Sequence, residues 1–136
     1  MKKILLSTLL LILGLTAYAA TQGGGDAEIT FEATSHNFGT FPESSPKVTC
    51  VFKFKNTGDG PLVIHQAIAS CGCTVPQYPK EPIKPGESGQ IIVTYNGAGK
   101  FPGHFKKSIT IRTNGKSEMT RLYVEGDMQP KDAKTE

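Results

Sequence analysis

The segment from Val48 to Lys55 constrains the fold of this chain more than any other part of its sequence. Every second side chain in it is apolar, from Val48 through Cys50 and Phe52 to Phe54, and three of the four residues that alternate with them are Thr or Lys. An alternation with a period of two residues is typical of a strand that buries one face. The segment therefore predicts a half-buried β-strand.

Five further segments show strand patterns, and turn-forming residues separate them. No window of useful length has the 3.6-residue period of a helix, so no crossover helix is available for parallel βαβ units. These observations predict an all-β antiparallel sandwich with six clear strands and a short seventh, about seven in all. The five further segments are residues 29–33, 62–69, 90–95, 107–113 and 120–126.

Two turns have strong sequence signals. Residues 56–61 (NTGDGP) combine residue types that tolerate positive φ with a proline that presets φ, and residues 85–89 (PGESG) form the second turn. A tight hairpin centred on the first turn would join the strands on either side of it. That pairing would place Cys50 opposite Ala67.

The first nineteen residues are typical of a cleaved secretory signal. Lys2 and Lys3 precede an apolar run over residues 4–15, and residues 17–19 (AYA) fit the A-x-A pattern for a cut before Ala20. The apolar run is shorter than the ~20 residues that a spanning helix needs. We therefore expect a periplasmic or secreted protein, with no membrane insertion after cleavage.

Cleavage at this position would leave 117 of the 136 residues, which suits one domain. The loss of Lys2 and Lys3 lowers the formal net charge from +3 to +1. A near-neutral chain has no electrostatic footprint for nucleic acid, so we expect no nucleic-acid partner. We expect a flexible lead-in at 20–27, one domain at 28–127 and a flexible tail at 128–136.

Three motifs in a fixed order resemble those of a known family. Residues 52–58 read F-x-F-x-N-T-G, residues 70–74 read S-C-G-C-T, and residues 85–88 read P-G-E-S. The chain resembles, over residues 29–127, the bacterial exported family of unknown function that carries these motifs. The N-T-G and P-G-E elements are shared with Hydin-type immunoglobulin-like domains. The resemblance implies an immunoglobulin-like β-sandwich and no particular activity.

The chain has three cysteines, so at least one thiol cannot pair within it. Cys50 lies on the apolar face of its strand and is expected to be a buried thiol. Cys71 and Cys73 would have Cα atoms about 6.6 Å apart in an extended strand, and a positive-φ bend at Gly72 could bring them within disulfide range. Three alternatives stay open for this pair: a disulfide or redox pair, a soft-metal site for Cu(I) or Zn(II), or another structural role.

Cys71 and Cys73 alone are weak evidence for a metal site, because such a site needs more than two protein ligands. The three histidines, His36, His65 and His104, are the candidates for further ligands, and none stands at a ligand-like spacing. We therefore expect no cofactor and no confident metal site.

Residues 96–104 (NGAGKFPGH) form a Gly-rich loop with an aromatic residue near its tip. Lys100, Phe101 and His104 make this loop a candidate for binding a partner. No catalytic residues are expected, because the Gly-Glu-Ser-Gly of residues 86–89 lacks the spacing of a serine nucleophile. We expect an exported non-enzymatic module that binds an envelope or surface protein. The alternative is thiol-redox or soft-metal binding through the Cys-Gly-Cys element.

Overall fold

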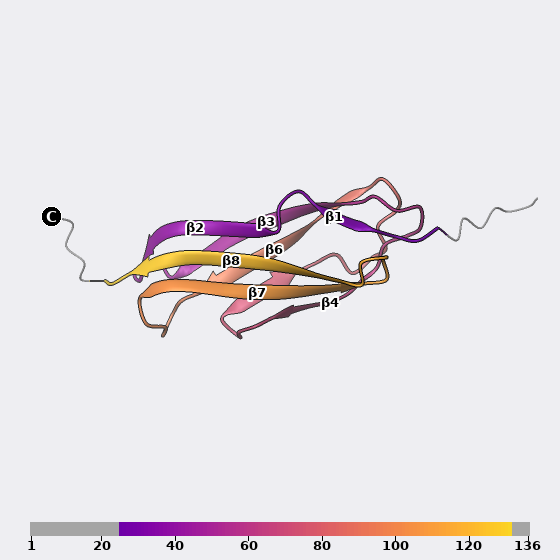
Figure 1. Cartoon of the computed structure of the whole chain (residues 1–136). Coiled ribbons are helices and arrows are strands. Elements are labelled where there is room, and N and C mark those ends of the chain that lie inside the picture. The colour runs from indigo at the N-terminus through magenta and orange to yellow at the C-terminus, as the bar shows by residue number, and fades with distance from the viewer. Residues whose placement is uncertain (1–24, 132–136) are drawn as a thin grey trace, which may run out of the picture.

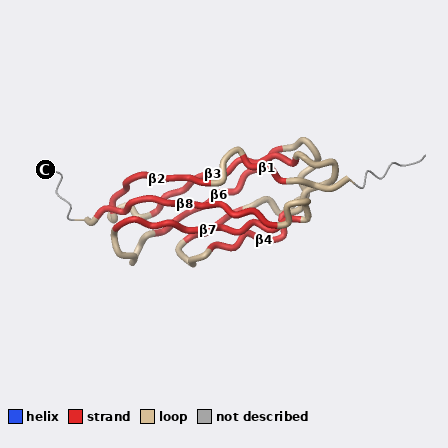
Figure 2. The backbone as a smooth tube through the Cα atoms, viewed as in Figure 1, coloured by secondary structure: helices blue, strands red, loops and turns tan. Residues whose placement is uncertain are grey.

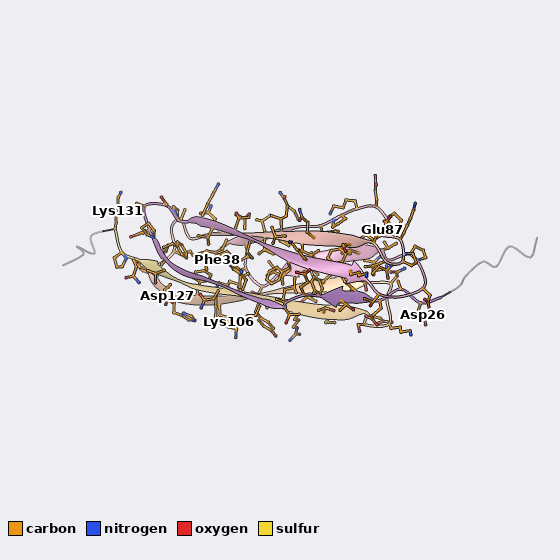
Figure 3. The ribbon with its side chains drawn as sticks, turned by 90° about the horizontal axis from the view of Figure 1, so that it is seen from above. Asp26, Phe38, Glu87, Lys106, Asp127 and Lys131 are labelled. Carbon is orange, nitrogen blue, oxygen red and sulfur yellow. A yellow bond between two sulfur atoms is a disulfide. The ribbon has the colours of Figure 1, made fainter. Side chains whose placement is uncertain are left out.

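The computed structural model describes residues 25–131. The signal expected at 1–19, most of the expected lead-in and the last five residues lie outside this range. The described chain forms two four-stranded sheets (Figure 1), and Figure 2 shows strands joined by loops throughout. In this part of the chain there is no helix long and apolar enough to cross a membrane. Asp26 and Lys131 lie at opposite ends of the molecule (Figure 3).

The first sheet is built around the alternating segment that the sequence singles out. Its strand pairs antiparallel with the next long strand, from Lys47 opposite Asn96 to Lys55 opposite Ser88. The apolar side chains of Phe52 and Phe54 face the core, whereas the lysines face solvent. In spatial order the strands are β1 (Ile29–Phe31), β3 (Lys47–Asn56), β6 (Ser88–Asn96) and β5 (Thr74–Gln77).

The second sheet is centred on a long hairpin. Its two strands pair antiparallel from Gly103 opposite Met128 to Arg112 opposite Met119. The core lies between the two sheets, and seven aliphatic side chains in it are 0% exposed: Leu62, Ile91, Val93, Ile109, Ile111, Leu122 and Val124. In spatial order the strands are β2 (Ser35–Pro42), β8 (Met119–Gln129), β7 (Gly103–Thr113) and β4 (Ile64–Ala69).

The all-β sandwich is confirmed, but it has eight strands in the described range. The sequence pattern missed β2 because a bulge around Gly39, which has a φ of 69°, shifts the register and breaks the alternation. It did not locate β5, which has four residues and contains Pro76. The expectation of purely antiparallel pairing is wrong for one pair, since β2 runs parallel to β8. The chain reaches β2 by crossing from one sheet to the other after β1, so no crossover helix is needed.

The expected hairpin across residues 56–61 is wrong. β3 and β4 belong to different sheets, and Cys50 lies opposite Val93 of β6 rather than opposite Ala67. The side chain of Asn56 is the physical reason. It is 0% exposed, and its Nδ2 donates hydrogen bonds to the carbonyls of Gly60 and Ile83, both at 2.8 Å. These bonds tie the turn to Gly60 and to the segment at Ile83, and the chain after it enters the second sheet as β4.

Both expected domain boundaries move outward. Ala27, placed in the expected lead-in, is buried at 3% exposure, and the neighbouring Asp26 carbonyl accepts a hydrogen bond of 2.9 Å from the Asp59 N–H. Met128, placed in the expected tail, is buried at 1% exposure, and β8 continues to Gln129. Both segments are rich in polar residues or glycine, and such a composition predicts a flexible chain rather than a packed one.

Candidate functional site

The loop between β6 and β7 holds Phe101 in solvent, with the side chain 97% exposed. The loop is nevertheless ordered by its own hydrogen bonds. The N–H of Lys100 donates to the Gly97 carbonyl at 3.0 Å, and the N–H of Ala98 donates to Oδ1 of Asn96 at 3.0 Å. An ordered loop on a rigid sheet can present its side chain to a partner in a fixed geometry.

The base of this loop rests on a small aromatic cluster, here called the distal cluster, formed by Phe41, Tyr95, Phe105 and Met128. The rings of Tyr95 and Phe105 stack at a centroid distance of 3.8 Å. Gly97 lies against this cluster so closely that a Cβ at that position would be 2.6 Å from Sδ of Met128. The close approach anchors the loop to the sandwich, while its tip stays free.

His104 does not join Lys100 and Phe101 in one site. It lies in β7, and its ring faces two carboxylates of β8: Nδ1 is 3.2 Å from Oδ1 of Asp127, and Nε2 is 3.5 Å from Oε2 of Glu125. These contacts lie on the outer face of the second sheet. Of the three residues proposed from sequence, only Lys100 and Phe101 belong to the loop.

Cys71 and Cys73 form a disulfide in the corner between β4 and β5, with their Cα atoms 5.2 Å apart. The positive-φ bend that Gly72 permits is not used, because that residue does not have a positive φ. The corner is closed instead by the N–H of Thr74, which donates to the Cys71 carbonyl at 3.1 Å. Cys73 packs against the distal cluster, and its carbonyl accepts a hydrogen bond of 2.8 Å from the N–H of Asn96. The corner and the Phe101 loop therefore share one base.

The three histidines that could have completed a metal site stand on three different strands. His36 is in β2, His65 is in β4 and His104 is in β7. Within residues 25–131, no group of three or more His, Cys, Asp or Glu side chains is placed to hold a metal ion. The described residues thus offer the two sulfurs of Cys71 and Cys73 no third ligand.

Cys50 is a buried thiol, 6% exposed, in the core between the sheets. Burial raises the pKa of this thiol to about 11, because the charged thiolate loses its hydration. Thiolate is the reactive form, so at about pH 8 only ~10⁻³ of the group is reactive even before access is considered.

We expect the folded protein, prepared without reductant, to resist iodoacetamide at mildly alkaline pH. After unfolding in concentrated guanidinium chloride, one thiol per chain should react, since Cys71 and Cys73 are bonded. Mass spectrometry of the intact protein counts the added groups. Fast labelling of the folded chain would contradict the burial of Cys50, and three labels after unfolding would contradict the disulfide.

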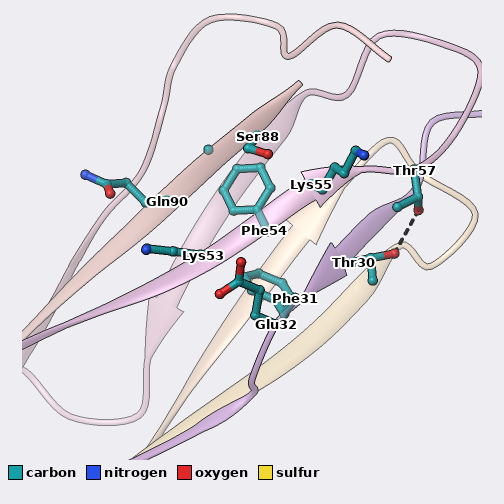
Figure 4. A pocket seen from close by; sticks show the side chains of 10 residues that line it. Thr30, Phe31, Glu32, Lys53, Phe54, Lys55, Thr57, Ser88 and Gln90 are labelled. Atoms are coloured by element: carbon teal, nitrogen blue, oxygen red, sulfur yellow. Dashed lines mark hydrogen bonds between the residues drawn. The ribbon is translucent and has the colours of Figure 1, made fainter. Parts of the chain in front are cut away.

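A groove of about 660 Å³ crosses β1, β3 and β6 at the other end of the first sheet (Figure 4). The rings of Phe31 and Phe54, 5.6 Å apart, belong to its lining together with the charged side chains of Glu32, Lys53 and Lys55. Sequence reasoning did not find this groove. The sequence feature that could have indicated it is the pair Lys53 and Lys55, which are two residues apart and therefore lie on the same outward face of β3.

The family model described as "Protein of unknown function (DUF1573)" matches residues 29–128. The chain belongs to this family. The match covers the whole sandwich from the first residue of β1 almost to the end of β8. No curated protein sequence matches the chain.

Solved structures share the fold at low sequence identity. A protein of unknown function from Porphyromonas gingivalis is 19% identical with a TM-score of 0.62, covering 76% of this chain and 46% of that one. The chain thus spans about half the length of that relative. The human PapD-like domain 7 of CEP192 is 10% identical with a TM-score of 0.60, covering 77% and 87%. A chaperone complex with a tip adhesion subunit from Acinetobacter baumannii is 13% identical with a TM-score of 0.50, covering 77% and 58%. These likenesses establish a PapD-like, immunoglobulin-like sandwich.

Proposed function

We propose that this member of the DUF1573 family is an exported, non-enzymatic module that binds a protein partner in the envelope or at the cell surface. The observation that carries the proposal is Phe101, which is 97% exposed on an ordered loop. Covering a phenylalanine side chain on a partner would contribute about 2–3 kcal/mol to binding. A single buried aromatic anchor is a common centre of binding energy at protein interfaces.

The surroundings of Phe101 support the same reading. Lys100 precedes it and adds a charge that can steer an acidic partner. The corner that carries the Cys71–Cys73 disulfide lies against the base of the same loop, and disulfides persist in exported proteins. The A. baumannii structure holds a chaperone with a tip adhesion subunit, so a sandwich of related architecture accepts a protein partner.

We expect replacement of Phe101 by serine to lower partner capture about tenfold or more, because it removes the apolar anchor. The measurement is affinity capture from an envelope extract with the tagged mature chain, quantified against the unsubstituted protein. Met119→Ser is the matched control, since Met119 is another exposed apolar residue, 48% exposed, at the opposite end of β7 and β8. Equal capture by the Phe101→Ser protein, or equal losses in both variants, would contradict the proposal.

A further inference from the structure

β3 has a sheet neighbour along its whole length on one side only. β6 pairs with it from Lys47 to Lys55, whereas β1 pairs only with Phe54, Lys55 and Asn56 on the other side. After Phe31 the chain leaves the first sheet, and its next strand, β2, belongs to the second sheet. No strand of residues 25–131 therefore pairs with the side of β3 from Lys47 to Phe52 that faces away from β6, and the segment from Glu32 to His36 passes beside only Val51 and Phe52. This side is called the open lane. In Figure 1, β3 extends well beyond the short β1.

The backbone of the open lane is oriented to accept a strand. The N–H of Glu32 donates to the Lys53 carbonyl at 3.0 Å, so the peptide groups of Lys53 point towards the β1 side. In an antiparallel sheet this direction alternates from residue to residue. The N–H and C=O groups of Val51 and Thr49 therefore face the lane, and those of the residues between them face β6. Unpaired edge groups of this kind are a template for an added strand.

The end of the lane beside β1 is hollowed. An open pocket of about 190 Å³ lies where the chain leaves β1, and its lining is mixed: Glu32, Ala33, Ser35, His36, Val51, Phe52 and Lys53. A cavity of about 150 Å³ in a protein core holds a benzene ring, so this pocket has room for an aliphatic or aromatic side chain. Val51 is 46% exposed and borders both the pocket and the lane.

The outer border of the lane is basic. Lys47, Lys53 and Lys55 all project from the outer face of β3, on the same side as Val51. None of them forms an ion pair with a carboxylate of the described residues. Glu32 is the acidic side chain beside them, next to Lys53 (Figure 4). Charge complementarity therefore favours an acidic partner on this face.

We propose that the open lane binds an extended acidic segment of a partner protein, which adds an antiparallel strand to β3 in line with β1. Acidic side chains of the segment lie on the outer face opposite Lys47 and opposite Val51, the second being a diagonal neighbour of Lys53, and an apolar side chain opposite Phe52 enters the 190 Å³ pocket. This inference rests on the proposed function, since it names a mode by which the module holds a protein. It uses a surface separate from the Phe101 loop.

The test titrates the ¹⁵N-labelled mature protein with two blocked peptides, one alternating Glu and Val and the other alternating Lys and Val. The Glu-Val peptide should give saturable amide shifts centred on Thr49 and Val51 and bind about tenfold or more tightly than the Lys-Val peptide. Shifts centred on Ile68 at the β4 edge or on Phe101, equal binding of the two peptides, or no saturable binding would each overturn the proposal.

Two variants test the backbone and the charge separately. Val51→Pro removes an N–H that faces the lane but none that faces β6, so binding should fall about tenfold or more, whereas Val51→Thr should bind like the unsubstituted protein. In case the proline variant does not fold, the double variant Lys47→Glu, Lys53→Glu should reverse the peptide preference. If the proline variant and the double variant both bound the peptides like the unsubstituted protein, the proposal that the open lane binds an acidic segment would be overturned. If partner capture depends on Phe101 but neither peptide binds the lane, the lane proposal fails while the proposed function stands.

Discussion

Replacing Asn56 by alanine is expected to lower the free energy of unfolding by about 3–4 kcal/mol, a large share of the stability of a small domain. The side chain is 0% exposed, and it satisfies two backbone carbonyls, of Gly60 and Ile83, together with the N–H of Gly58 at 3.0 Å. Alanine leaves the Gly60 carbonyl and the Gly58 N–H without this partner, while the Ile83 carbonyl keeps only the N–H of Leu62, which donates to it at 2.8 Å. Water cannot reach a buried site to replace the lost bonds, so the penalty is that of unsatisfied polar groups.

Asn114→Ala is the matched control for this prediction. Its amide also makes two hydrogen bonds to backbone groups, accepting from the Val63 N–H at 2.8 Å and donating to the Pro61 carbonyl at 3.0 Å, but the residue is exposed. Water replaces those bonds, so we expect a loss of about 1 kcal/mol or less. Equilibrium urea unfolding measures both variants. A smaller loss for Asn56→Ala than for Asn114→Ala would refute the buried network.

Replacing Gly58 by alanine is the second large effect we expect, with a loss of about 2–3 kcal/mol. The sequence suggests that this glycine serves a positive φ, but the structure shows none there. The glycine is needed for close approach. A Cβ at this position would overlap the Asp26 carbonyl and the Glu28 N–H, which are backbone atoms of the segment before β1. That segment is held by the Thr57 N–H, which donates to the Glu28 carbonyl at 2.9 Å. The backbone must therefore move to make room.

Gly72→Ala provides the comparison at another motif glycine. A Cβ there would meet no atom within 4 Å, and the residue does not have a positive φ. We expect a change within about 0.5 kcal/mol, as for an ordinary surface substitution. Thermal and urea unfolding of the two variants, side by side, would contradict the close-approach argument if Gly58→Ala were as stable as Gly72→Ala.

The parts of the fold that the sequence predicts well are those with uninterrupted alternation. β3 and β6 follow directly from it, because each buries one face along its whole length. β2 did not, because its bulge around Gly39 destroys the period of two. The hairpin at residues 56–61 failed for a different reason: local turn propensity predicts a tight turn, but the buried hydrogen bonds of Asn56 connect residues distant in sequence. Long-range satisfaction of polar groups cannot be derived from local pattern.

The candidate site also has residues that the sequence could identify and residues that it could not. Phe101 could be found from sequence, since an aromatic residue in a Gly-rich loop has no neighbouring apolar residues to pack with. The partnership of His104 with Asp127 could not, because it depends on the register between β7 and β8. The groove beside Lys53 and the open lane beside Val51 depend on where the chain changes sheets after β1. No local signal marks that crossing.

Site-specific photo-crosslinking in intact cells tests most directly whether the module binds protein through its Phe101 loop. Phe101 is replaced by p-benzoylphenylalanine, and Met119, at the opposite end of the molecule, carries the same replacement in the control. Irradiation should give a discrete covalent adduct with one partner protein from position 101 and none from position 119. Absence of an adduct at position 101, or the same adducts from both positions, would contradict the account.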